Sequence, residues 1–201
     1  MMIQKKLTLF ALAVGLAFAG HAQDHQPLEK AQNAARLITQ KAPTWGSPPV
    51  EVKPDIEKPY LVTGSNNLGA LVIPDKRLKN KKPLKPGGKA IPIGQLWMRG
   101  LAPEIDGAKV AGKDLREVSI STDEEDVELT AYLLAAKLDG DKATLLVYGK
   151  AKKPIATLKL KEAKTYQELP LELDAAGEDS GATLFFNVVG KYVAEMKIVE
   201  K

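Results

Sequence analysis

From residue 60 onward, apolar side chains recur at every second position, in short runs that end at glycine, proline or asparagine. This period is that of a β-strand, whose successive side chains point to opposite sheet faces. The strands predicted in this way cover residues 60–63, 70–73, 91–98, 117–121, 127–136, 143–148, 155–161, 169–174, 182–189 and 192–199. Many short strands without a βαβ pattern predict an all-β fold, and we expect an antiparallel β-sandwich rather than an open barrel.

Some details of these strands remain open at this point. Residues 127–136 are rich in Ala and Leu, so a helix is the alternative there. Ile91, Ile93, Gln95 and Trp97 alternate with other residues, which predicts that these four share one sheet face. Between the last two strands, Gly190-Lys191 predicts a two-residue hairpin turn of type II′.

The turn at residues 178–181 resembles the one that precedes a late strand in immunoglobulin domains. Thr183 and Phe185 stand where that fold has Tyr and Cys. The likeness therefore concerns the architecture alone. It implies a sandwich that is immunoglobulin-like or of a related type.

Residues 1–22 have the pattern of a cleavable signal peptide. Lys5 and Lys6 precede an apolar run from Leu7 to Ala19, which is shorter than the roughly 20 residues that span a bilayer as a helix. Both Ala17-Phe18-Ala19 and Gly20-His21-Ala22 fit a cleavage site, and we expect cleavage after Ala22 because polar residues follow it. An uncleaved anchor is the alternative. Export to the periplasm of a bacterium, or secretion from it, is therefore expected, with no transmembrane segment in the mature chain.

Residues 23–58 have a different character from the strands. Apolar residues at helical spacing after Pro27 predict one short helix over residues 27–41. Five prolines follow between Pro43 and Pro59, and they predict an extended, irregular segment over the domain surface or a linker. The expected organisation is a signal peptide (1–22), an N-terminal helix with a Pro-rich linker (23–58) and a β-sandwich domain (59–201).

The composition excludes several kinds of chemistry. The chain has no cysteine, and His25 is the one histidine after residue 22, where we expect a solvated tail. Thiol nucleophiles, thiolate metal sites and histidine-based catalysis therefore lack their residues. Without Lys5 and Lys6 the chain keeps 27 basic and 25 acidic residues, so no general basic field for nucleic acid exists. We expect a protein that is not an enzyme and that has no cofactor or metal.

One segment is strongly basic. Residues 76–89, named the basic loop below, contain no acidic residue and seven basic ones: Lys76, Arg77, Lys79, Lys81, Lys82, Lys85 and Lys89. Such a loop repels itself and is expected to be solvated. The functional alternative is that it binds an anionic glycan, a lipid head group or an acidic protein face.

Three further functions remain open, one of which is an assembly protein that pairs with partners through the edge strands near Pro170 or through the C-terminal hairpin. A carbohydrate-binding module would use exposed aromatic rings, for which Trp45, Tyr60 and Trp97 are the candidates, although burial of Trp97 is expected. A carboxylate-based hydrolase would need two close acidic groups in a cleft. The acidic cluster at residues 123–128 is expected to be a solvated turn, with a calcium site as the alternative.

Overall fold

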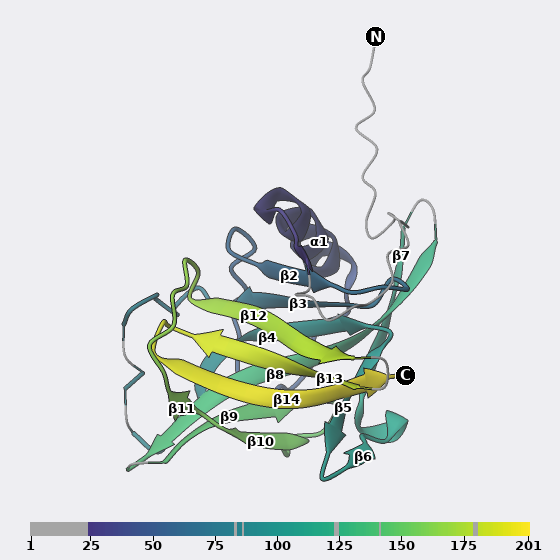
Figure 1. Ribbon diagram of the computed structural model, residues 1–201. Coiled ribbons are helices and arrows are strands. Elements are labelled where there is room, and N and C mark those ends of the chain that lie inside the picture. The colour runs from purple at the N-terminus through teal and green to yellow at the C-terminus, as the bar shows by residue number, and fades with distance from the viewer. Residues whose placement is uncertain (1–23, 83, 86, 123–124, 141, 179–180) are drawn as a thin grey trace.

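The strands form two antiparallel sheets that face each other, as the computed structural model shows (Figure 1). It describes residues 24–201 except positions 83, 86, 123, 124, 141, 179 and 180. The larger sheet has the order β1-β2-β3-β4-β8-β9-β10, with β7 beside β9 on the same flank of β8. Its strands are β1 (Asp24–His25), β2 (Tyr60–Thr63), β3 (Gly69–Pro74), β4 (Ile91–Arg99), β7 (Arg116–Ser121), β8 (Asp126–Asp139), β9 (Lys142–Tyr148) and β10 (Ala156–Lys159).

The smaller sheet has the order β12-β13-β14-β5-β6, and β11 adds to β14. Its strands are β5 (Leu101–Ile105), β6 (Ala108–Lys109), β11 (Lys161–Glu162), β12 (Leu171–Glu178), β13 (Gly181–Val188) and β14 (Tyr192–Glu200). The short 3-10 helix η1 (Gly112–Asp114) lies between β6 and β7. The predicted antiparallel all-β sandwich is confirmed, including strand β8, and the likeness to immunoglobulin domains stays a prediction.

The chain passes directly from one sheet to the other at two corners. β4 ends at Arg99, and Gly100, with φ of 68°, turns the chain into β5 of the smaller sheet. Leu160 lies in the same way between β10 and β11, and its side chain is buried between the sheets. Strands that switch sheets at bends are a known way to build the corners of a sandwich. These corners fix how the two sheets pack.

Both faces of the larger sheet are covered. One face packs on the smaller sheet through the main core, which includes Ile93, Tyr132, Leu145 and Phe186. Helix α1 (Leu28–Lys41) covers part of the other face with Ala31, Ala34, Ala35 and Ile38. Burial on both faces explains why β3 and most of β8 are continuously apolar instead of alternating.

The Pro-rich segment covers a further part of that outer face. Val50 is buried there with Leu133, Ala135 and Tyr148 of β8 and β9. Pro54 forms an isolated bridge with Asp75 at the end of β3.

The predicted helix at residues 27–41 is confirmed. The boundary near residue 58 therefore marks a change of secondary structure within one packed body. At its N-terminal side, His25 pairs with Val62, so the backbone there is part of a strand and not of a free tail.

A β-bulge in β4 changes which side chains share a face. The register with β8 shifts between Pro92 and Gly94, so Ile93 is the extra residue. Ile93 faces the main core, whereas Trp97 faces α1 on the other side of the sheet. The expectation that Ile93 and Trp97 share one face is therefore wrong, because the bulge breaks the alternation of two.

The hairpin between β13 and β14 also differs from expectation. Its turn has three residues, Val189, Gly190 and Lys191, because Val188 pairs with Tyr192. Val189 and Gly190 have φ of 51° and 69°, so both are left-handed, unlike a type II′ turn. A left-handed conformation is rare for a β-branched residue. It is maintained here by Val189 N–H donating to Pro170 O and by Lys81 N–H donating to Val189 O.

Candidate functional site

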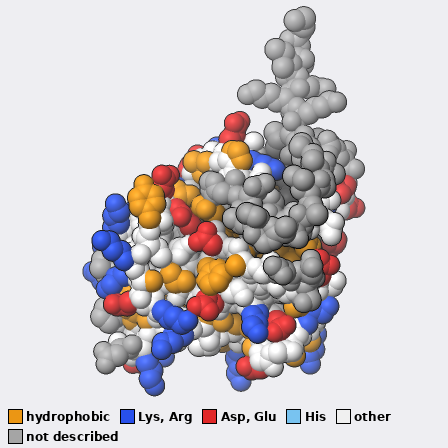
Figure 2. Space-filling view, in the orientation of Figure 1, with side chains coloured by type: hydrophobic (Ala, Val, Ile, Leu, Met, Phe, Trp, Pro, Cys, Tyr) orange, Lys and Arg blue, Asp and Glu red, His pale blue; other side chains and the backbone are white. Residues whose placement is uncertain are grey.

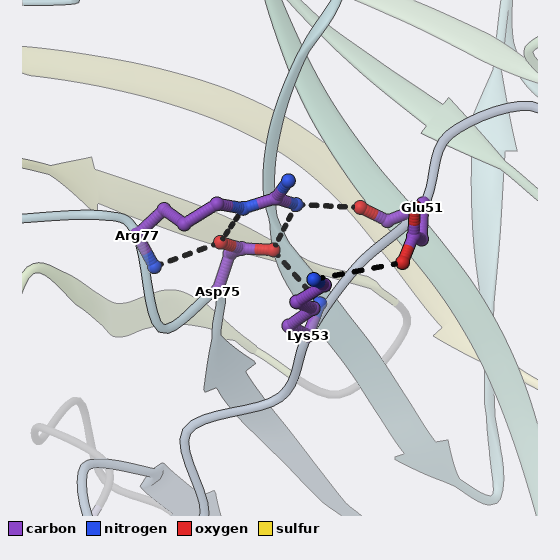
Figure 3. A network of polar contacts seen from close by, with 4 residues as sticks. All are labelled: Glu51, Lys53, Asp75 and Arg77. Carbon is purple, nitrogen blue, oxygen red and sulfur yellow. Dashed lines mark hydrogen bonds and ion pairs between the residues drawn. The ribbon is translucent and has the colours of Figure 1, made fainter.

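The basic loop begins at an ion pair between the buried Asp75 and the half-exposed Arg77 (Figure 3). Asp75 is 1 % exposed, and its carboxylate accepts hydrogen bonds from Arg77 Nε and Nη2, both at 2.7 Å. Backbone N–H groups of Lys53 and Arg77 donate to the same carboxylate at 2.8 and 2.9 Å. Burial alone would raise the pKa of Asp75, but these hydrogen bonds lower it below its ordinary value. The carboxylate is therefore charged and fully paired at neutral pH.

Arg77 is an anchor of the loop rather than a free cation. Its Nη2 also donates to Glu51 O at 2.7 Å, and its bonds to Asp75 raise the pKa of its guanidinium. Glu51 and Lys53 belong to the Pro-rich segment, so this network joins that segment to the start of the loop (Figure 3). Arg77 was a candidate for binding an anionic partner, and the structure places its charge in this internal contact.

Two buried leucines anchor the basic loop in the main core. Leu78 and Leu84 are each 7 % exposed and pack into the main core between the sheets. The lysines between and around them are exposed. The alternation of buried leucines and exposed lysines shows that the loop closes one end of the sandwich and presents its charges outward.

A polar clamp ties the loop to the smaller sheet. Asn80 Nδ2 donates to the carbonyl oxygens of Gln167 and Glu168, each at 3.0 Å. Lys81 N–H donates to Val189 O at 3.0 Å. Gln167 is 6 % exposed, and its Oε1 accepts the N–H of Gly190 at 2.6 Å. Three segments that are distant in sequence are thus held together at this edge.

The remaining six basic residues of the loop are exposed: Lys76, Lys79, Lys81, Lys82, Lys85 and Lys89. Within the part of the chain that the structure describes, no acidic side chain forms an ion pair with any of them. Figure 2 shows Lys and Arg side chains gathered along the left edge, where Figure 1 places the connection between β3 and β4. Their positive charge is therefore directed to the solvent.

The three aromatic candidates do not form a common platform. Trp97 is 3 % exposed beneath α1, and its Nε1 donates to Gln95 Oε1. The Trp45 ring packs on the outer face of the larger sheet, and the guanidinium carbon of Arg116 lies 4.3 Å from its centroid. Tyr60 is half-buried at the edge of the main core. This geometry gives no support to sugar stacking on these rings.

A group of carboxylates lies near Tyr60, at the side where β12 approaches β2 and β3. Burial, together with the charges of Glu172 and Asp174, raises the pKa of Tyr60 to about 12. Burial also raises the pKa of Glu172, although its Oε1 accepts the N–H groups of Glu168 and Leu169, both at 2.7 Å. Glu172 thus organises the turn before β12. Asp174 Oδ2 accepts Asn187 Nδ2 at 2.6 Å.

The acidic cluster at residues 123–128 is only partly visible. Asp123 and Glu124 lie outside the described residues, and Glu125 forms an ion pair with Arg99 at 3.1 Å. Among the described residues, no group of three or more His, Cys, Asp and Glu side chains is arranged to hold a metal ion. The described part of the chain also contains no helix of sufficient length and apolar character to cross a membrane.

The sequence did not identify the residues that organise this edge. Asn80 and Gln167 lie in irregular segments 87 residues apart, and no periodic pattern connects them. Tyr166, next to Gln167, is 95 % exposed. The one sequence feature that pointed to this edge was the basic loop itself.

Comparison with known proteins adds no relative: no family model, no curated protein and no solved structure matches the chain.

Proposed function

We propose that this protein is an exported, non-catalytic binding protein of the bacterial envelope, which engages anionic partners through the lysines of the basic loop. The observation that supports it is the set of six exposed lysines without an ion pair among the described residues, carried by a loop that is fixed at both its leucines and at Asn80. Cations on a fixed loop lose less conformational freedom on binding than cations on a loose one.

The location rests on residues 1–22, which lie outside the described residues. A basic start followed by a short apolar run and small residues supports cleavage and export. Expression of the full chain in a bacterium, followed by mass determination of the periplasmic or secreted form, tests this. A mass that fits a start at Gln23 supports export. A full-length mass in the membrane fraction supports an anchor.

The binding proposal is tested with dextran sulfate, a soluble polyanion, over a series of salt concentrations. The first variant combines Lys79→Gln, Lys81→Gln and Lys82→Gln and is named the loop triple. We expect its dissociation constant to rise by about tenfold or more at low salt, since each exposed cation contributes on the order of 1 kcal/mol near a strongly anionic surface. Binding by the unaltered protein should weaken steeply as salt is added.

A matched control distinguishes the effect of the charges on the basic loop from the effect of the net charge of the protein. The turn triple combines Lys150→Gln, Lys152→Gln and Lys153→Gln at the opposite end of β9 from the basic loop, where the lysines are also exposed. It changes the net charge by the same amount, and we expect its affinity to stay within about twofold of the unaltered protein. Equal losses in both triples would contradict a role of the basic loop.

A further inference from the structure

Tyr166 is the most exposed large hydrophobic side chain in the described part of the chain. It is 95 % exposed, and the other one in that class, Leu28, is 45 % exposed. At this exposure both faces of the Tyr166 ring are open to solvent. Because a tyrosine gains free energy by burying its ring, a fully exposed one is unusual in a chain with few aromatic residues.

The backbone beneath Tyr166 is firmly held. The next residue, Gln167, is buried and accepts hydrogen bonds from Gly190 N–H and from Thr165 Oγ1, the latter at 3.1 Å. Its Nε2 donates to Leu169 O, and its carbonyl oxygen accepts Asn80 Nδ2. The ring therefore projects from a fixed support instead of from a loose loop.

Positive charges surround this support. Lys79 and Lys81 flank the clamping residue Asn80, and Lys82 follows them. Lys164, two residues before Tyr166, is exposed and has no ion pair among the described residues. Two carboxylates oppose these four lysines: that of Glu168, which is exposed, and that of Glu172, which accepts the N–H of Glu168. The surroundings of the ring are thus cationic on balance.

We propose that Tyr166 and these lysines dock the protein on an anionic lipid bilayer. The phenol ring enters the interface at the depth of the head groups, and Lys79, Lys81, Lys82 and Lys164 contact lipid phosphates. Tyrosine prefers this interface because its ring is apolar and its hydroxyl stays hydrated. Lysines close to an anionic leaflet add to the attraction.

The exposure of the ring favours a bilayer over a glycan. A ring that stacks on a sugar commonly lies flat on the protein and offers one face, whereas Tyr166 offers both and stands alone. A single projecting ring is suited to entering a soft surface. This inference rests on the proposed role of the basic loop and goes beyond it by naming the partner surface.

Vesicle sedimentation tests the proposal with the mature chain. The vesicles contain phosphatidylglycerol and phosphatidylcholine in equal parts, and pure phosphatidylcholine vesicles are the neutral control. We expect binding to the anionic vesicles alone and a partition coefficient lower by about tenfold in Tyr166→Ala, from the apolar area that the ring buries. Tyr166→Trp should bind as well as the unaltered protein. Brominated lipids should quench the fluorescence of Tyr166→Trp more than that of the unaltered protein, whose tryptophans are packed in the fold.

Dextran sulfate binding, measured in parallel, distinguishes this inference from the proposed function. Tyr166→Ala should bind dextran sulfate within about twofold of the unaltered protein, since the ring carries no charge. Unchanged vesicle binding in Tyr166→Ala, or an equal loss toward dextran sulfate, would overturn the membrane inference. Binding of the unaltered protein to dextran sulfate without binding to vesicles would overturn it too, but would leave the proposed function standing. Binding to neither would contradict both.

Discussion

Arg77 binds Asp75 two residues before it, with Nε and Nη2 each 2.7 Å from a carboxylate oxygen. The same carboxylate accepts Lys53 N–H from the Pro-rich segment. One buried charge therefore joins the end of β3, the start of the basic loop and the segment that covers the outer face of the larger sheet. A buried carboxylate is stable only with such complete pairing.

The substitution Asp75→Asn should destabilise the fold by about 1–3 kcal/mol at pH 7, because the buried amide would turn its NH2 group toward N–H donors that now donate to the carboxylate. Urea unfolding monitored by tryptophan fluorescence measures this. Asp106→Asn is the control, since Asp106 lies exposed in a turn with φ of 53°, which asparagine adopts readily. Similar free energies of unfolding for the two variants would show that the Asp75 contacts contribute little.

The contribution of Asp75 should depend on pH in a defined direction. Its pKa is lowered in the folded protein, so its stabilisation is present above the unfolded pKa of about 3.9 and is lost as pH falls through the folded value. We expect the difference in unfolding free energy between the unaltered protein and Asp75→Asn to be constant from pH 7 to about pH 5 and to shrink in stronger acid. Unfolding curves at pH 7, 5, 4 and 3 measure it. A difference independent of pH would count against a charged Asp75.

The pH dependence of stability linked to Glu172 should have the opposite sign to that linked to Asp75. Its pKa is raised by burial and by the nearby carboxylate of Asp174, so the folded state disfavours its charge. Stability linked to Glu172 is present below the unfolded pKa of about 4.3 and is lost as pH rises through the folded value. Glu172→Gln keeps an oxygen that accepts the two N–H groups and removes the charge. We therefore expect it to stabilise the protein by several tenths of a kcal/mol at pH 7.

The same substitution should have no effect below about pH 4, where the native glutamate is protonated. Glu172→Ala is the matched comparison, because it removes the acceptor of Glu168 N–H and Leu169 N–H along with the charge. It should be destabilising by about 1 kcal/mol or more at both pH values. A destabilising effect of Glu172→Gln at pH 7 would mean that the hydrogen bonds to the carboxylate outweigh its unfavourable burial.

The strands could be predicted from the sequence because each carries a local pattern. β9 and β14 each carry an apolar residue at every second position. Gly140 and Gly149 flank β9, and Gly190 precedes β14. β5 was missed because Pro103 interrupts a short run directly after Gly100. Its place in the sheet depends on pairing with β14, which lies almost 100 residues later in the chain and has no local signal.

Only the positive charges of the candidate site could be predicted from the sequence. The lysines of residues 76–89 are visible in the sequence, but the capture of Arg77 by Asp75 depends on how the loop folds back. The clamp between Asn80 and Gln167 joins two irregular segments, and the exposure of Tyr166 follows from that clamp. Contacts between distant irregular segments have no periodicity, so pattern analysis cannot find them.

Gly94, which follows the bulge residue Ile93 in β4, is tightly packed, and a substitution there tests the packing of β4. At Gly94 the strand runs so close to its neighbours that an added Cβ would lie 2.5 Å from Ile73 O and 3.1 Å from Leu171 Cδ2. The carbonyl belongs to the backbone of β3 and cannot yield without disturbing the sheet. Gly94→Ala should therefore lower the free energy of unfolding by about 2 kcal/mol or more, through overpacking between the two sheets.

Gly112→Ala provides the control for this prediction, because a Cβ at Gly112 would meet no atom within 4 Å. We expect it to change the free energy of unfolding by no more than about 0.5 kcal/mol. Both variants are compared by urea unfolding at pH 7, away from the titration of the carboxylates. If Gly94→Ala were as stable as Gly112→Ala, the close approach of β4 to β3 at Gly94 would be in error.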